Sequence, residues 1–150
     1  MVFIDTNVFF YFYDDRFPRQ QLSSRLWLTH LAAQERGLSN LQVANEFTNV
    51  VFKRLPHLSR ETVFQMTDDI LVWGETALSP ETVAGARQIC LRYHYSWWDC
   101  LLLASALELG CTHFLSEDLQ DGQTIGVETG KGLTIVDPFA HTPEQILISL

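Results

Sequence analysis

Residues 2–8 have the sequence Val-Phe-Ile-Asp-Thr-Asn-Val, in which a short apolar run is followed directly by an acid. Val2 to Ile4 predict a short buried strand, and Asp5 follows directly at its carboxyl end. The same pattern occurs later in the chain, where His113 to Leu115 predict a strand and Asp118 comes shortly after it. Ligands of open α/β sheets bind at the carboxyl ends of the strands, so both acids are expected at a binding edge.

The rest of the chain alternates between short apolar segments and helical patterns. The apolar run Val8 to Phe12 is expected to lead into a polar loop around Asp14, Asp15 and Pro18. Apolar residues at helical spacing, with Ser, Asn or Pro at the starts, predict helices over about 20–35, from Asn40 to before Pro56, over 59–72, from 79 and from 96. Further strands are expected at 38–39, 76–78 and 133–136, with a turn-rich stretch over 121–132.

Short strands separated by helices imply right-handed crossovers and a parallel sheet covered on both faces. The 150 residues, of which 47% are hydrophobic, suffice for one such domain over 1–150 and not for two. The apolar run Cys100 to Leu107 is too short to span a membrane, and Asp5 interrupts the apolar N-terminus, which lacks the pattern of a secretory signal. We therefore expect a cytoplasmic protein whose cysteines, Cys90, Cys100 and Cys111, are reduced core residues.

The formal net charge of −8 argues against a broad basic surface for nucleic acid. That objection weakens if part of the acid is gathered in a metal site, because bound cations would cancel it. Lys53, Arg54, Arg16 and Arg19 are the best candidates for phosphate contacts, although solvated surface charge is the commoner role for any one of them.

Four acids occupy positions where a protein core would not favour them: Asp5, Glu46, Asp99 and Asp118. Each of these acids could also have a purely structural role. Asp5 and Asp118 could cap a turn or helix, Glu46 could reach solvent from the edge of an apolar helix stripe, and Asp99 could form a capping box with Ser96. Taken together, two acids at strand ends and two on helices packed against the sheet can converge on one crevice.

Such a cluster cannot stay ionised in apolar surroundings without a counter-charge, and no Lys or Arg adjoins any of the four acids in sequence. A divalent cation is the simplest remedy. Ligands that are all oxygen favour Mg²⁺ or Mn²⁺, whereas the histidines and cysteines show no spacing typical of zinc.

Four motifs follow one another along the chain: Phe-Ile-Asp-Thr-Asn-Val at 3–8, Val-Ala-Asn-Glu-Phe at 43–47, Trp-Trp-Asp-Cys-Leu-Leu-Leu-Ala-Ser-Ala at 97–106 and Phe-Leu-Ser-Glu-Asp-Leu-Gln at 114–120. In this order and at these separations they resemble the PIN-domain ribonucleases, and more narrowly the toxins of the VapC type. The resemblance implies a single-domain, three-layer α/β/α sandwich with a short central parallel sheet. It also implies an endoribonuclease that uses Mg²⁺ or Mn²⁺ to hydrolyse single-stranded or loop RNA, leaving a 5′-phosphate and a 3′-hydroxyl.

The resemblance also assigns roles to residues. Asp5 and Asp99 would be the principal metal ligands, Glu46 and Asp118 would hold metal directly or through water, and Asn7 and Ser116 would orient them. For a toxin of this type it implies a homodimer and a small antitoxin protein, whose C-terminal segment fills the acidic groove with an Arg.

Two features depart from this pattern. Asp121 could be a further ligand or the first residue of an Asp-Gly turn, and the turn is favoured. Trp97 and Trp98 could stack on a base, but beside so apolar a helix core packing is favoured.

Other function classes remain as alternatives. A receiver-like regulatory domain would need an acid pair after the first strand, but Asp14 and Asp15 come too late, and Lys131 is its only candidate lysine. A PIN fold that has lost catalysis is disfavoured because all four acids are present. A PIN nuclease that processes RNA without an antitoxin stays open.

Overall fold

A five-stranded sheet lies at the centre of the computed structural model, which describes residues 1–147. Strand β1 (Val2–Ile4) pairs in parallel with β2 (Gly37–Leu38) and with β3 (His113–Leu115), and β3 pairs in parallel with β5 (Leu133–Val136). Strand β4 (Thr124–Ile125) is antiparallel to β5, which gives the order β2-β1-β3-β5-β4. The expected parallel sheet is therefore correct except for β4, which lies within the stretch predicted as turns.

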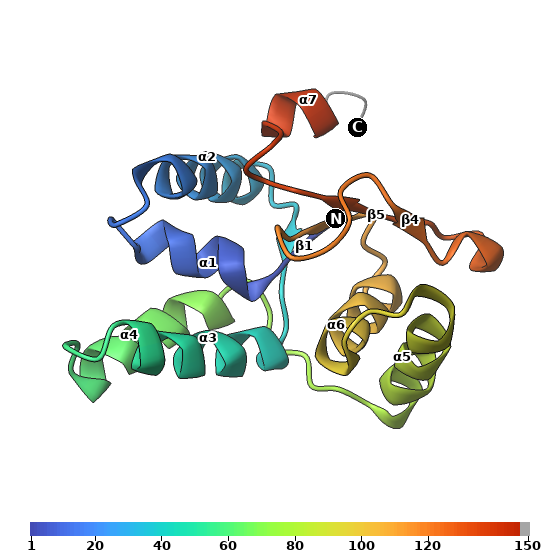
Figure 1. Ribbon diagram of the computed structural model, residues 1–150, viewed down its shortest axis with the longest axis horizontal. Coiled ribbons are helices and arrows are strands. Elements are labelled where there is room, and N and C mark those ends of the chain that lie inside the picture. The colour runs from blue at the N-terminus through green and yellow to red at the C-terminus, as the bar shows by residue number, and fades with distance from the viewer. Residues whose placement is uncertain (148–150) are drawn as a thin grey trace.

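Helices cover both faces of this sheet. They are α1 (Thr6–Tyr13), α2 (Pro18–Ala33), α3 (Leu41–Arg54), α4 (Arg60–Leu71), α5 (Pro80–Tyr93), α6 (Trp97–Glu108) and α7 (Pro143–Leu147). Helices α1 to α4 gather on one side of β1, and α5 and α6 pack together on the other side (Figure 1). The three-layer α/β/α architecture is confirmed.

The predicted helix starts agree with the capping groups. Asn40 caps α3, where its side-chain oxygen accepts a hydrogen bond from the Val43 N–H at 3.0 Å. Ser59, Ser79 and Ser96 cap α4, α5 and α6 in the same manner. Each of these side chains satisfies a backbone donor at the start of its helix, which is why Ser and Asn mark helix starts in a sequence.

The observed secondary structure also differs from expectation in several other places. Residues Val8 to Phe12 belong to helix α1, which Asp5 caps by accepting from the Thr6 N–H at 2.7 Å. Val8, Phe9 and Phe10 are consecutive and all buried, and such an unbroken apolar run shows no helical period in the sequence. No strand forms at 76–78, and the short helix α7 was not predicted. Helix α2 also begins at Pro18 and ends at Ala33, two residues earlier than predicted at both ends.

Strand register brings two polar side chains together at the carboxyl edge of the sheet. Ile4 pairs with Leu115, so Asp5 and Ser116 leave their strands side by side, and the Asp5 N–H donates to the Leu115 carbonyl at 3.1 Å. The buried Phe3 and Phe114 rings stack beneath them, with centroids 5.2 Å apart. This rigid pair of strands is the platform for the site.

The cysteines Cys90, Cys100 and Cys111 are free; Cys100 and Cys111 are buried and Cys90 is half-buried. Burial raises the pKa of the Cys111 thiol to about 11, so it stays protonated near neutral pH. Over residues 1–147, no helix combines the length and apolar character needed to cross a membrane.

Candidate active site

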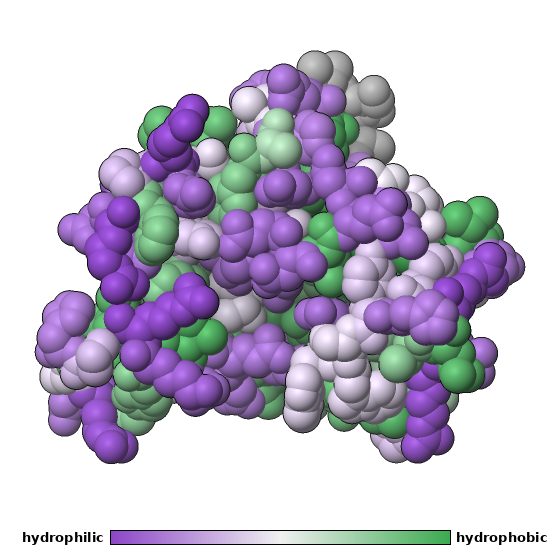
Figure 2. Space-filling model, in the orientation of Figure 1, coloured by the Kyte–Doolittle hydropathy of each residue, from purple (hydrophilic) through white to green (hydrophobic). Residues whose placement is uncertain are grey.

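A pocket of about 310 Å³ opens where β1 and β3 end, between helices α1, α3 and α6. All four acids predicted from the sequence line it, together with a fifth that was not predicted; they are Asp5, Glu46, Asp99, Asp118 and Glu117. Near its centre, the face shown in Figure 2 is hollowed, and hydrophilic residues border the hollow. The acids come from four separate parts of the chain, so the tertiary fold creates the cluster.

Asp5 is the most deeply placed of these acids, with 4% of its surface exposed. Its Oδ1 accepts from the Thr6 N–H at 2.7 Å, and its Oδ2 accepts from the Ser116 hydroxyl at 2.8 Å. Burial raises the pKa of Asp5 to about 7; the two hydrogen bonds oppose this shift, and the charges of Asp99 and Glu46 add to it. Asp5 does cap helix α1, as the alternative explanation held. Its hydrogen bonds nevertheless leave the negative charge of the carboxylate only partly compensated.

Glu46 faces the pocket from α3 and is half-buried. Its carboxylate accepts from the Thr6 hydroxyl at 3.1 Å and from the Gln42 amide at 2.8 Å. Burial raises its pKa, against the effect of these two hydrogen bonds. Glu46 is therefore fixed in place by neighbours and does not extend freely into solvent.

Asp99 lies in the first turn of α6, where its N–H donates to the Ser96 hydroxyl at 3.2 Å. The Ser96 hydroxyl in turn donates to the Asp99 carboxylate at 2.8 Å. Burial raises the Asp99 pKa, and the negative charge of Asp118 raises it further. Proximity to the start of a helix favours an acid here, but the pocket around the carboxylate works against ionisation.

Asn7 and Ser116 connect Asp5 to Asp118. The Asn7 amide donates to the Ser116 hydroxyl at 3.2 Å and to the Asp118 carboxylate at 3.0 Å, while Ser116 donates to Asp5. The Asn7 Oδ1 is buried and accepts no hydrogen bond within the described chain. A buried acceptor without a donor is costly, which favours a water or a cation beside it.

Glu117 and Tyr11 are site residues that sequence reasoning missed. Burial raises the Glu117 pKa, while hydrogen bonding by the Tyr11 hydroxyl lowers it. The signal for Glu117 was its place between Ser116 and Asp118. Tyr11 lies one helical turn after Asn7 on α1, so it could be found only by recognising that helix.

The predicted phosphate contacts separate in space. Arg54, in the last turn of α3, lines the acidic pocket. It brings a positive charge to the four acids, none of which has a Lys or Arg next to it in sequence. Arg16 instead pairs with Asp14 at 2.8 Å, and Arg19 lies beside Phe139 at another surface. Lys53 is exposed and does not line the pocket.

Asp121 lies outside the pocket. Its carboxylate accepts from the Asp137 N–H at 2.8 Å and pairs with the His141 ring at 2.7 Å, and these contacts lower its pKa. Gly122 follows with a φ of +81°, as a turn at Asp-Gly requires. The structure thus gives Asp121 the turn position that the sequence favoured.

The expectation of core packing for Trp97 and Trp98 is wrong. Trp97 is 37% exposed and Trp98 63% exposed, whereas the buried part of the helix begins at Cys100.

The donor set of the pocket fits a hard divalent cation. Carboxylate, amide and hydroxyl oxygens face the pocket, and the orphaned Asn7 Oδ1 adds a neutral acceptor. Within residues 1–147 no three acidic, histidine or cysteine side chains stand close enough to enclose an ion together. Mg²⁺ tolerates such spacing, because it commonly keeps several waters and binds only one or two carboxylates directly.

Comparison with solved structures supports the fold. A toxin–antitoxin complex from Klebsiella pneumoniae contains a chain that is 14% identical, with a TM-score of 0.62 over 92% of this chain and 98% of the other. The Mycobacterium tuberculosis toxin VapC20, described as cleaving the sarcin-ricin loop, is also 14% identical, with a TM-score of 0.54 over 76% of this chain and 87% of the other. No curated protein matches in sequence. The sequence model of the PIN domain matches residues 2–120, so the chain belongs to the PIN domain family.

Proposed function

We propose that this protein is an endoribonuclease that hydrolyses RNA phosphodiester bonds with Mg²⁺ or Mn²⁺, and that it is the toxin of a toxin–antitoxin pair. The observation that carries the proposal is the convergence of Asp5, Glu46, Asp99 and Asp118 on one pocket. Within residues 1–147, Asp5 has no ion-pair partner, and its pKa of about 7 marks a carboxylate lacking a counter-charge. Perturbed acids clustered in a cleft are typical of functional sites.

Asp5 and Asp99 are the principal candidates to hold the metal, with Glu46 and Asp118 binding it directly or through water. A metal ion bound there would supply an activated water and stabilise negative charge on the leaving oxygen. The protein's own contribution is to orient the ligands: Ser116 and the Thr6 N–H hold Asp5, and Asn7 holds Asp118.

Electrostatics give the metal a second role in this proposal. A pocket lined by five acids repels the phosphates of RNA, and the chain as a whole carries a formal charge of −8. Metal binding reduces that repulsion, and the Arg54 guanidinium at the rim would then meet a phosphate next to the cleaved one. Cleavage should therefore depend on metal both for chemistry and for substrate binding.

The toxin assignment adds a partner. The Klebsiella chain of similar fold comes from a toxin–antitoxin complex, and an acidic groove suits a small antitoxin whose C-terminal segment supplies an Arg. We also propose that the chain forms a homodimer and acts in the cytoplasm as a single domain spanning 1–150.

The alternatives are a PIN nuclease that processes RNA without an antitoxin and a silent or receiver-like module. A receiver-like module is disfavoured because Asp14 and Asp15 lie at the far end of α1 from Asp5, and Arg16 neutralises Asp14.

Cleavage of labelled single-stranded RNA tests the nuclease directly. With Mg²⁺ or Mn²⁺ the wild type should produce fragments with 5′-phosphate ends, and EDTA should abolish them. Asp5→Asn and Asp99→Asn should lose the activity, while Asp15→Asn, at an exposed acid outside the pocket, should retain it. Cleavage that survives EDTA, or that survives in both pocket variants, would exclude the proposed site.

Growth of a bacterial host separates a toxin from a processing enzyme. Expression of the wild type alone should arrest growth, and expression of Asp5→Asn should not. Harmless expression of folded, RNA-cleaving wild type would favour the processing nuclease.

A further inference from the structure

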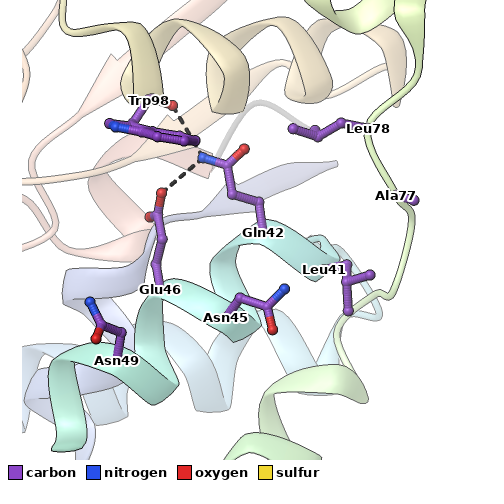
Figure 3. A pocket seen from close by; sticks show the side chains of 8 residues that line it. All are labelled: Leu41, Gln42, Asn45, Glu46, Asn49, Ala77, Leu78 and Trp98. Atoms are coloured by element: carbon purple, nitrogen blue, oxygen red, sulfur yellow. Dashed lines mark hydrogen bonds between the residues drawn. The ribbon is translucent and has the colours of Figure 1, made fainter.

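A second pocket, of about 590 Å³, lies against the acidic one and has a different character. It lies between the start of α3, the extended segment at 77–78 and the first turn of α6 (Figure 3). Three apolar side chains and three amide side chains line most of it: Leu41, Leu78, Trp98, Gln42, Asn45 and Asn49. We name it the amide pocket.

The amide pocket and the acidic pocket adjoin each other. Glu46 and Asn49 line both of them. A chain whose phosphate lies among the acids therefore has a neighbouring part within reach of the amide pocket. The two pockets offer complementary surfaces for the two parts of a nucleotide: acids that can hold metal for the phosphate, and an apolar, amide-lined space beside them.

Trp98 forms one side of the amide pocket and is 63% exposed. In Figure 3 its ring is seen edge-on beside Gln42, with Asn45 and Asn49 across from it on α3. An exposed indole costs free energy in water, and a flat aromatic face beside an RNA backbone is a stacking platform for a base.

Polar groups in the amide pocket fit the edge of a base. The Gln42 amide nitrogen donates to Glu46 at 2.8 Å and to the Trp98 carbonyl at 3.3 Å, which fixes the side chain. Its Oε1 is buried without a hydrogen-bond partner in the described chain. Asn45 is exposed and can present both an amide donor and an acceptor.

We propose that the amide pocket binds one nucleobase of the RNA next to the cleaved phosphate, with the base stacked on Trp98 and its polar edge facing the exposed amide of Asn45. This inference rests on the proposed nuclease function and adds a determinant of affinity and base preference to it. Trp98 supplies stacking, which every base can make, and the Asn45 amide supplies discrimination between bases.

Binding of a cleavage-resistant, mixed-sequence RNA octamer, measured with Mg²⁺ present, tests the stacking. Trp98→Ala should weaken binding roughly 5- to 100-fold, the range expected for loss of one stacked base, and Trp98→Phe should restore most of it. Trp97→Ala is the matched control: it removes the neighbouring indole, which does not line the amide pocket, and should change binding little. In a Trp97→Phe background the octamer should quench the tryptophan fluorescence. Adding Trp98→Phe, which leaves the buried Trp27 and the half-buried Trp73, should abolish the quenching.

Asn45→Ala tests base selection separately. It should leave the overall affinity within a few-fold of wild type and change the order of binding among octamers of A, C and U. Circular dichroism of each variant guards against misfolding.

The outcomes distinguish this inference from the nuclease proposal. If the wild type cleaves RNA with metal but Trp98→Ala binds the octamer as tightly as Trp97→Ala does, the base site is wrong and the nuclease stands. In that case a side chain of a protein partner would be the better candidate to occupy the amide pocket. If the wild type neither binds nor cleaves RNA, both proposals fail.

Discussion

Two buried aspartates lie at the two ends of helix α1 and differ in their electrostatic environment. Asp5 begins the helix and is 4% exposed, and Asp14 ends it and is 1% exposed. Arg16 donates two hydrogen bonds to Asp14, at 2.8 and 2.9 Å, and lowers its pKa. Asp5 receives only neutral donors, and its pKa rises to about 7.

The difference separates a structural acid from a functional one. Burial alone does not mark a site, because both aspartates are buried. What distinguishes Asp5 is burial among further acids, including Glu46 and Asp99. Arg54 lines the same pocket, but no cation of residues 1–147 pairs with Asp5 or lowers its pKa. A fold keeps such an arrangement at a cost in stability, and a ligand that relieves the cost is its simplest explanation.

The largest expected effect is on RNA cleavage. Asp5→Asn should reduce the rate roughly 100-fold or more, because Asn keeps the shape of Asp but loses the anionic ligand. Asp14→Asn should leave the rate of the folded enzyme within a few-fold of wild type. Cleavage assays at saturating RNA compare the two, and equal losses would remove the distinction between the aspartates.

Ser116→Ala should have an intermediate effect. Ser116 is a positioning residue that orients Asp5 at 2.8 Å, and loss of such a partner typically costs roughly 10- to 100-fold in metal affinity or activity. The loss should appear as a higher Mg²⁺ requirement that excess Mg²⁺ partly rescues. A loss that no metal concentration rescues, with the fold intact, would contradict this role.

Stability in EDTA should depend on pH with opposite sign for the two aspartates. Between pH 3.8 and about 7 the folded state holds a proton at Asp5 that the unfolded chain has released, so the free energy of unfolding falls as pH rises. The shift is worth at most ~4 kcal/mol. Asp14 contributes stability that is present above its ordinary pKa and is lost as pH falls through its lowered pKa.

Urea unfolding from pH 4.5 to 7.5 measures this slope. The decrease of the unfolding free energy with pH should be shallower in Asp5→Asn than in wild type. It should not vanish, because Glu46, Asp99 and Glu117 also have raised pKa values and contribute in the same direction. Parallel curves for Asp5→Asn and wild type would show that the Asp5 carboxylate is compensated after all.

A smaller effect concerns thermal stability at pH 7. Asp14→Asn should lower Tm by a few degrees, because it loses the ionic hydrogen bonds from Arg16. Without metal, Asp5→Asn should melt no lower than wild type, since Asn caps a helix as well as Asp and relieves the repulsion. Calorimetry gives both values, and a larger loss for Asp5→Asn would reverse the comparison.

The sequence predicted the parts of the fold that have local signals. Strands β1, β3 and β5 are short apolar segments, and helices α3 to α6 begin at capping Asn or Ser residues. Helix α1 was missed because Val8 to Phe12 form an unbroken run of apolar and aromatic residues, which shows neither a helical nor a strand period. Strand β4 is two residues long and depends on pairing with β5, which no local pattern records.

The candidate site was predictable where it rests on acids at strand ends and on helices facing the sheet. Glu117 adjoins Asp118 in sequence, yet which of two adjacent acids faces a pocket is decided by the turn after β3. Arg54 is eight residues after Glu46, and only the helical geometry of α3 brings it to the same pocket. The exposure of Trp98 depends on the tertiary packing around the first turn of α6, which composition does not encode.

Metal-dependent melting tests most directly whether the uncompensated acids form a metal site. At a metal concentration about tenfold above Kd, Mg²⁺ or Mn²⁺ should stabilise the wild type by about 1.4 kcal/mol and raise its Tm, because the ion binds only the folded state. Asp14→Asn should show the same increase from its lower starting point, and Asp5→Asn should show little or none. Equal increases in wild type, Asp14→Asn and Asp5→Asn would contradict the assignment of the metal to this pocket.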